Sequence, residues 1–429
     1  MNIFQRYINL QNNQYVQYLD RPATKSTIFV VIPCYDEPDI VTTLNSLANS
    51  IPPKGSVTVL IVVNDAENSA PKVVERNILT LKSITEWRSL QPDVYFQVQL
   101  LYAHALPSKW AGVGWARKLG MDEAVRQIAN NGFSDGIIVS LDADCTVSSN
   151  YLHAIEGAFN QNPKSNFFLI NFEHPLDACA LDASIREGII RYELHMRYYR
   201  NALQWSGYPH AIHTVGSSFA LKASAYVKQG GMNRRKAGED FYFLHKLILL
   251  GHYGNIQNAT VFPASRISDR VPFGTGAALK KWEEGSPELN TTYSLEAFSH
   301  LKPLFNSVSA YWSMENAELE NSLTKFHPIL HFFCNTSLLI SQLLELKNNC
   351  SNASVFIRRF FHQFNAFWIL KYLNFAHENS LIRNELSSES RKLLYNLGIE
   401  TDQDSSLEEL LRIYRKLDRE ITNNSDSQC

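Results

Sequence analysis

Short apolar, β-branched runs alternate with longer helical stretches through the first 270 residues, and this alternation constrains the fold more than any other feature of the sequence. Nearly continuous apolar runs, as strands covered on both faces require, occur at 27–32 (TIFVVI), 57–63 (VTVLIVV), 94–101 (VYFQVQLL) and 137–141 (IIVSL). Helical stretches lie between them at 40–49, 71–87 and 112–130. This pattern predicts an α/β fold with a mainly parallel, Rossmann-like sheet flanked by helices and connected by right-handed crossovers. Further strands are expected at 166–171 and 211–221, separated by a long helix at 181–205.

The pattern changes beyond about residue 290, where strand signals end and the chain becomes helical, aromatic and basic. One helical stretch is expected at 356–378 and another at 406–421, with Asp404, Ser405 or Ser406 as the N-cap of the latter. A chain of 429 residues exceeds the usual size of one hydrophobic core. We therefore expect an N-terminal extension (1–25), an α/β domain (26–290) and a helical C-terminal region (291–429).

Composition excludes some classes of partner. The chain has 40 basic and 42 acidic residues, and this balance argues against nucleic-acid binding, which normally needs a basic excess. Six cysteines without metal-type spacing indicate reduced thiols rather than a disulfide framework. The N-terminus lacks the pattern of a signal peptide, and the apolar stretch 329–346 is interrupted by polar residues. We expect no transmembrane span and a cytoplasmic location, with peripheral contact at the inner membrane face left open.

Acidic residues follow three of the four predicted strands. Glu37 comes after the first, Asp65 after the second, and Asp142 and Asp144 follow the fourth. Ligands of parallel open sheets bind outside the carboxyl ends of the strands, so these acids are expected on one rim. Asp residues also cap helices that follow strands, and for Asp65 alone that explanation is equally good.

The Asp142-Ala143-Asp144 element is the most specific of these. It follows an apolar strand and precedes an expected helix start at 146–148. Carboxylate oxygens are ligands that Mg²⁺ and Mn²⁺ accept while keeping positions open for diphosphate oxygens. We therefore predict that Asp142 and Asp144 bind a divalent metal, Mn²⁺ or Mg²⁺.

Six segments together resemble family 2 of the glycosyltransferases, which has the GT-A fold. They occur in the order of that family over residues 26–265: VVIPCYDE (30–37), VLIVVNDAEN (59–68), KWAGVGWARKLGMDEA (109–124), VSLDADCTVSSNYL (139–152), GSSFALKASAYVKQGGMN (216–233) and AGEDFYFLHKL (237–247). The resemblance implies a nucleotide-diphosphate sugar as donor and makes 26–290 a GT-A domain.

The same resemblance implies roles for individual residues. Pro33, Tyr35 and Glu37 would border the nucleotide base, and Asp65 would lie beside the uracil or ribose. Asp142 and Asp144 would hold the metal that binds the donor, and Asp240 would be the catalytic base. Lys109 and Arg117 stand where the family has basic residues near the donor.

Two further expectations come from the residues themselves. Asp240 opens a helical stretch, where a carboxylate can take the proton of an acceptor hydroxyl or simply interact with the helix dipole. Arg266 and Arg270 precede a Gly-Thr-Gly sequence and would suit a loop that contacts phosphates, although an ordinary surface loop has the same composition. The third metal ligand of some GT-A enzymes, a histidine, is not evident, which leaves Asp269 as a weak substitute.

The sequence thus predicts a metal-dependent glycosyltransferase that inverts configuration and transfers to an unidentified saccharide, lipid-linked or small-molecule acceptor. The Gln-x-x-Arg-Trp motif of processive relatives is absent from the sequence, which favours a non-processive enzyme. A sugar-phosphate nucleotidyltransferase is the alternative from another enzyme class, but it would carry a glycine-rich loop after the first strand. A catalytically silent relative that binds sugars or partners is the third hypothesis.

Overall fold

The computed structural model describes residues 2–11, 16–19, 25–132, 135–177, 182–235, 238–268, 270 and 274–420. The chain divides into two compact units that interleave in sequence. Unit 1 spans Met1–Leu181 and Thr214–Ala277, and unit 2 spans Asp182–His213 and Ala278–Ile421. The boundaries expected at 26–290 and 291–429 remain a prediction.

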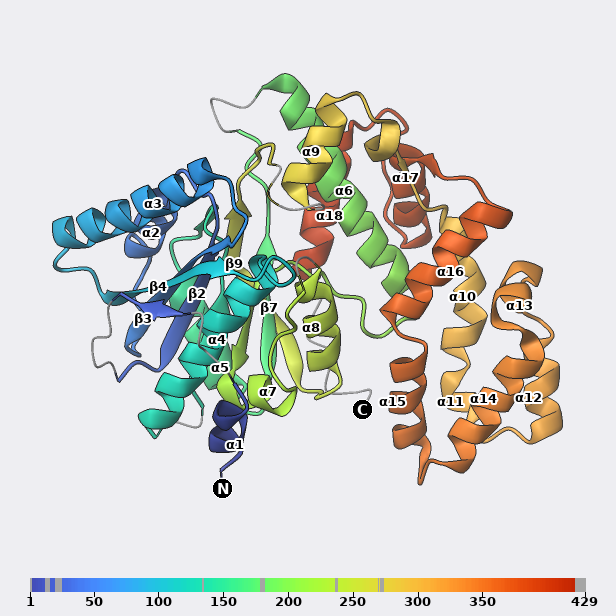
Figure 1. Cartoon of the computed structure of the whole chain (residues 1–429). Coiled ribbons are helices and arrows are strands. Elements are labelled where there is room, and N and C mark those ends of the chain that lie inside the picture. The colour runs from blue at the N-terminus through green and yellow to red at the C-terminus, as the bar shows by residue number, and fades with distance from the viewer. Residues whose placement is uncertain are drawn as a thin grey trace. The chain divides into compact units, whose positions relative to one another are not determined.

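Unit 1 contains a nine-stranded sheet formed by described residues, in the order β1-β4-β3-β2-β5-β8-β7-β9-β6 (Figure 1). Its strands are β1 (Gln17–Tyr18), β2 (Ile28–Cys34), β3 (Val57–Ala66), β4 (Phe96–Leu106), β5 (Ile137–Ser140), β6 (Cys145–Val147), β7 (Phe167–Phe172), β8 (Phe219–Lys222) and β9 (Tyr253–Pro263). Its helices are α1 (Ile3–Asn9), α2 (Ile40–Ala48), α3 (Pro71–Leu90), α4 (Val113–Asn130), α5 (Tyr151–Gln161), α7 (Ala223–Lys228) and α8 (Glu239–Ile248).

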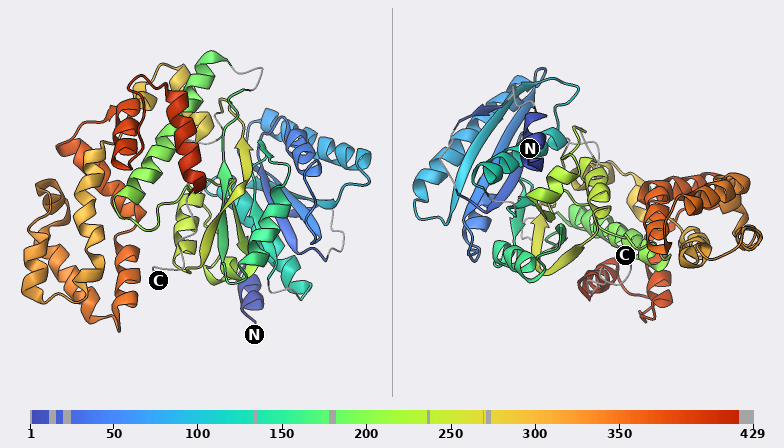
Figure 2. Two further views of the ribbon diagram at one scale, coloured as in Figure 1. Left: turned by 180° about the vertical axis from the view of Figure 1, so that it is seen from behind. Right: turned by 90° about the horizontal axis from the view of Figure 1, so that it is seen from below.

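The connections between strands determine which face each helix covers. The chain runs outward from β2 to β3 and β4 and then returns to β5 on the other side of β2, with all four strands parallel. Right-handed crossovers place the helices of the outward path on one face and the helix of the return path on the other. Accordingly, α2 and α3 cover one face and α4 covers the opposite face (Figures 1 and 2). Every residue of β2 is buried as a result.

The predicted α/β fold with a helix-flanked sheet and a helical C-terminal region is confirmed. The sheet is mixed, because β8 runs antiparallel between β5 and β7, and β1 and β6 are antiparallel to their neighbours. Of the strand expected at 211–221, only Phe219–Lys222 is a strand. The helix expected to start at 146–148 begins at Tyr151, since Cys145–Val147 pairs with β9 as β6.

Unit 2 is helical apart from the two-residue strands β10 (Thr291–Thr292) and β11 (Asn384–Glu385) among its described residues. Its first helix, α6 (Ala183–Trp205), packs with helices from the far end of the chain, α17 and α18. The helices after α6 are α9 (Thr275–Glu283), which begins in unit 1, α10 (Leu295–Asn306), α11 (Val308–Tyr311), α12 (Asn316–Leu323), α13 (Pro328–Cys334), α14 (Thr336–Asn348), α15 (Ala353–Gln363), α16 (Ala366–Asn379), α17 (Leu386–Asn396) and α18 (Leu407–Glu420), with the short 3-10 helix η1 (Pro287–Asn290).

Two expectations for the C-terminal region have clear outcomes. The stretch at 356–378 is two helices, because the Asn365 side chain accepts hydrogen bonds from the first amides of α16 and so starts a new helix. Ser406 caps α18, and its side chain accepts a hydrogen bond from the amide of Glu409.

No single helix of the described chain is long and apolar enough to cross a membrane. Only α13 and Leu338–Asn348 together reach that length, and this pair is bent by 67°.

Candidate active site

Carboxylates gather where the strand order reverses. Glu37 lies just after β2, and Asp142 and Asp144 lie just after β5, the parallel neighbour of β2. The crossovers leave β2 and β5 toward opposite faces of the sheet, and a crevice at such a switch point is where ligands of open α/β sheets bind. The turn is fixed by Thr43 of α2, whose hydroxyl donates to the carbonyl of Ala143 over 2.8 Å. Thr43 was missed in the sequence, where it is only a polar residue in a predicted helix.

Arg117 of α4 forms ion pairs with two acids of this region. Its side chain is buried in α4, and its guanidinium donates to Asp142 and to Glu239, the first residue of α8. Two glycines make this arrangement possible. A Cβ at Gly114 would lie 2.2 Å from the carbonyl oxygen of Arg235, and one at Gly216 would lie 2.9 Å from the guanidinium of Arg117. Arg117 thus pairs with two carboxylates at the rim, and its place near the donor stays a prediction.

Arg266 and Arg270 approach the same rim from the segment after β9. Both guanidiniums donate to one oxygen of Glu37, and both lie 3.3–3.4 Å from Oδ2 of Asp144. Burial and the charge of Asp142 raise the pKa of Asp144, while Arg270 and Arg266 oppose the increase. The two arginines and two acids therefore form one charge network. Asp142 also influences this network, because its negative charge repels that of Asp144.

Asp240 lies next to this network at the start of α8. Its Oδ1 accepts a hydrogen bond of 2.7 Å from the amide of Phe241. Burial and the charge of Asp142 raise the pKa of its carboxyl, and Arg117 lowers it. Burial likewise raises the pKa of Glu239 against the attraction of Arg117. Asp142, Arg117, Glu239 and Asp240 thus influence one another directly.

Asp65 lies at the end of β3 among hydrogen-bond donors from neighbouring segments. Its side chain is fully buried, and it accepts hydrogen bonds from the Tyr102 hydroxyl and the amide of Ala105, both over 2.9 Å. Asn77 of α3 donates to Asp65 and to the carbonyl of Asn64, and accepts from the amide of Asp36. Asp65 and Asn77 therefore fix the ends of β2, β3 and β4, and contact of Asp65 with the nucleotide stays a prediction.

The remaining predicted residues lie around this rim or beside it. Pro33 is buried within β2, and the carbonyl oxygen of Tyr35 accepts a hydrogen bond of 3.3 Å from Arg270. Lys109 is exposed in the turn before α4. Asp269, the substitute metal ligand, lies outside the described residues.

Asp142 and Asp144 carry carboxylate oxygens that are partly exposed to solvent and so accessible to a metal ion. Asp142 and Asp144 are 35% and 27% exposed, whereas Glu37 is buried. Five carboxylates (Glu37, Asp142, Asp144, Glu239 and Asp240) face three arginines (Arg117, Arg266 and Arg270) in this network. The excess is negative, so a divalent cation at Asp142 and Asp144 fits the charges present.

Comparisons with known proteins give structural similarity only. No family model matches the sequence, and no curated protein matches it. Among solved structures, the chain is similar to S. aureus TarS 1–349 in complex with UDP, at 14% identity over 88% of this chain and 94% of that one, with a TM-score of 0.38. It is also similar to S. aureus TarS 1–349 in complex with UDP-GlcNAc, at 13% identity over 87% and 93%, with a TM-score of 0.40. At this identity the similarity concerns the fold alone.

Proposed function

We propose that this chain is a glycosyltransferase that moves a sugar from a nucleotide-diphosphate sugar to an acceptor hydroxyl. The observation that supports this best is the charge network at the switch point between β2 and β5, where five carboxylates meet three arginines. Sugar transfer requires a base for the acceptor proton and positive charge for the departing diphosphate. The network contains groups of both kinds within one rim.

Asp240 is the proposed base, and the proposed stereochemical outcome is inversion. Its raised pKa increases its affinity for a proton, which favours proton abstraction as long as the group remains ionised. Arg117 opposes protonation of Asp240 and, through its pair with Glu239, fixes the first turn of α8. Arg117 is therefore a positioning residue in this proposal.

Asp142 and Asp144 are the proposed ligands of Mn²⁺ or Mg²⁺. A bound divalent metal would neutralise negative charge on the diphosphate as it leaves. Arg266 and Arg270 pair with Glu37 and Asp144. Guanidiniums bind phosphate in the same forked geometry as carboxylate, so both can turn to the diphosphate. Pro33, Tyr35, Asp65 and Lys109 are proposed to border the nucleotide.

The proposal is tested with the full-length chain and a panel of UDP-, GDP- and dTDP-sugars in the presence of Mn²⁺. A donor that binds the folded state raises the thermal midpoint by mass action. Release of nucleoside diphosphate, with water as the default acceptor, then measures turnover before the true acceptor is known. We expect Asp142→Asn and Asp144→Asn to remove metal-dependent turnover while the fold is kept, because each loses a hard ligand at an accessible rim.

Asp93→Asn is the matched control, because Asp93 is an exposed aspartate in the turn before β4. It should bind donor and turn over like the wild type. Full turnover of the wild type in excess chelator would rule out the metal. Donor binding without turnover under every condition would favour a catalytically silent relative.

A further inference from the structure

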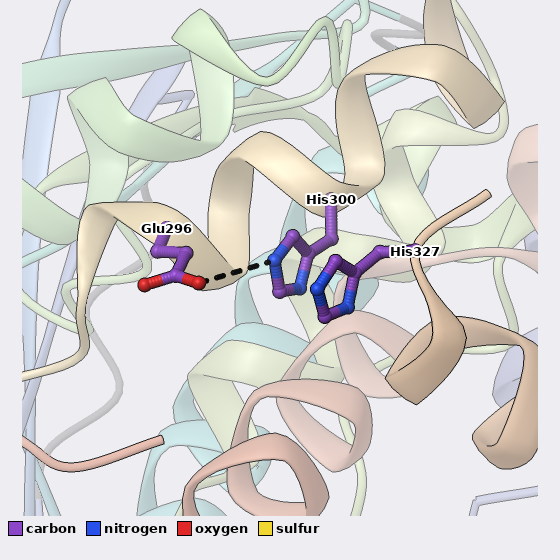
Figure 3. A group of neighbouring side chains, drawn as sticks. All are labelled: Glu296, His300 and His327. Atoms are coloured by element: carbon purple, nitrogen blue, oxygen red, sulfur yellow. Dashed lines mark ion pairs between the residues drawn. The ribbon is translucent and has the colours of Figure 1, made fainter. Parts of the chain in front are cut away.

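Three metal-ligand side chains converge in unit 2, and none of them is among the residues of the proposed reaction. Glu296 and His300 lie one turn apart on the same face of α10, and His327 immediately precedes α13. One potential ligand atom from each lies within 4.8 Å of the other two. Figure 3 shows the carboxylate of Glu296 directed at the His300 ring, with the His327 ring beside it.

His300 is already oriented as a metal-binding histidine requires. Its Nδ1 lies 2.8 Å from the hydroxyl of Tyr372, and its Nε2 faces Glu296 at 3.8 Å. Histidines that bind metals usually hydrogen-bond through their other nitrogen, which fixes the ring and its tautomer. The His300 side chain is 6% exposed, so its ring is held in place by the surrounding core.

His327 presents its ring parallel to that of His300. The ring centroids are 3.7 Å apart and the planes differ by 5°. Nδ1 of His327 receives only a long contact of 3.4 Å from the amide of Ile329 at the start of α13. Imidazole lone pairs lie in the plane of the ring, so the His327 ring must turn out of this parallel stack before both histidines can bind one ion, and the weak cap can be given up in that turn.

We propose that Glu296, His300 and His327 form a zinc-binding site. Two imidazoles and one carboxylate suit Zn²⁺, a borderline cation that takes N and O ligands in tetrahedral geometry, with water in the fourth position. Bonds of about 2 Å place tetrahedral ligand atoms roughly 3.3 Å apart, so the three groups need to approach by at most about 1.5 Å. Glu296 supplies much of this movement, because its side chain is 58% exposed.

The site would act as a clip within unit 2. His300 and His327 are separated along the chain by α11 and α12, so a metal that joins them closes this loop and fixes the start of α13 on α10. Metal affinity for such a preformed set adds to the stability of the folded state.

The test uses full-length chain that carries Asp142→Asn and Asp144→Asn, so that zinc at the proposed reaction site does not contribute. After chelator treatment, calorimetric titration with Zn²⁺ should give one site per chain. The thermal midpoint should rise by about 5 °C when free zinc is 100-fold above the dissociation constant. Bound Co²⁺ should show the visible absorption of tetrahedral coordination.

Two variants test the ligands without disturbing the core. Glu296→Gln changes an exposed side chain, and His327→Asn keeps a residue that is a good N-cap for α13. Each should weaken zinc binding by at least about 10-fold, with unchanged circular dichroism. His362→Asn, at an exposed histidine of α15, should bind zinc like its parent. Absence of stoichiometric zinc binding, or equal affinity in all three variants, would overturn the proposal.

Discussion

The buried guanidinium of Arg117 has two carboxylate partners from different segments of unit 1. It donates to Asp142 after β5 and to Glu239 at the start of α8. A planar guanidinium can bind two acids at fixed angles, whereas the ammonium of lysine is a single point charge on a flexible chain. The charge of Asp142 also acts on Asp240. The geometry between the proposed metal ligand and the proposed base therefore depends on Arg117.

Asp240→Asn should lower turnover by at least about 100-fold, the low end of what a general base contributes. Asparagine keeps the size of the side chain and can still accept a hydrogen bond from the amide of Phe241, but it cannot take a proton. Donor affinity, measured by titration with a nucleotide-sugar and Mn²⁺, should change little. A collapse of donor affinity would instead make Asp240 a binding residue, and Asp93→Asn again serves as the unaffected control.

Four of the five acids of this site were predicted from the sequence, but Glu239 and the pairing of the acids were not. Asp142 and Asp144 follow an apolar run directly and Glu37 stands shortly after another, so knowing the strands gives their positions at the rim. The arginines come from α4 and from the segment after β9, and no local pattern reveals which acid each contacts. Asn77 and Thr43 were missed because a polar residue in a helix is usually exposed, whereas both are buried here.

At the scale of elements, a buried charge network fastens α18 to α6. Asp418 of α18 pairs with Arg197 of α6 and with His213, and Arg415 pairs with Glu193. Burial raises the pKa of the Asp418 carboxyl, but His213, Arg197 and Arg200 outweigh burial and hold it well below its usual value. The two arginines alone are enough to lower the pKa of Asp418, because they stay charged at every relevant pH.

Asp418→Asn should destabilise the chain by about 3 kcal/mol at pH 7, since the buried guanidinium of Arg197 then keeps only Glu193, which it shares with Arg415, as an acidic partner. A carboxyl with a lowered folded-state pKa contributes stability above its unfolded pKa of about 3.9, and this contribution is lost as the pH falls through the folded pKa. The difference between variant and wild type should therefore be largest between about pH 5 and 7 and shrink below about pH 4.

Urea unfolding followed by circular dichroism at a series of pH values measures this difference. Asp404→Asn, at an exposed aspartate just before α18, is the control and should change stability by less than about 0.5 kcal/mol. A pH-independent loss in Asp418→Asn would show that its effect arises from packing rather than from charge.

The elements that the sequence predicted well are those with a single strong pattern. β2, β3 and β5 are covered on both faces and therefore read as continuous apolar runs. β9 was missed because glycine and polar residues interrupt it (YGNIQNATVFP), and its burial alternates over the first half. The residues before Phe219 are apolar enough for a strand but form no ladder, since β8 pairs only over Phe219–Lys222.

At the scale of the whole molecule, the two units interleave in sequence because α6 belongs with the C-terminal helices. A chain that ends at residue 290, the predicted domain boundary, would keep α6 but lose α10, α17 and α18. Tyr198 would then lose its contacts with Tyr293 and with Phe298 of α10, and Glu193 and Arg197 would lose their partners from α18. We expect this truncated chain to aggregate in size-exclusion chromatography.

A chain that ends at Glu420 is the matched control, since it retains every described helix and strand. It should elute and unfold like the full-length protein. A soluble 1–290 fragment with cooperative unfolding would instead establish 26–290 as an independent domain.

The separation of α6 from α18 in the sequence also affects how the protein is made. Roughly 200 residues separate these helices, and translation at about 5–20 residues per second takes about 10–40 s to cover them. Throughout this interval α6 is complete and its Glu193–Arg197 pair can form, but Arg415 and Asp418 of α18, which pair with these two residues, have not yet been synthesised. Yield in a cell therefore depends on whether α6 avoids aggregation until α18 has been synthesised and can pack on it.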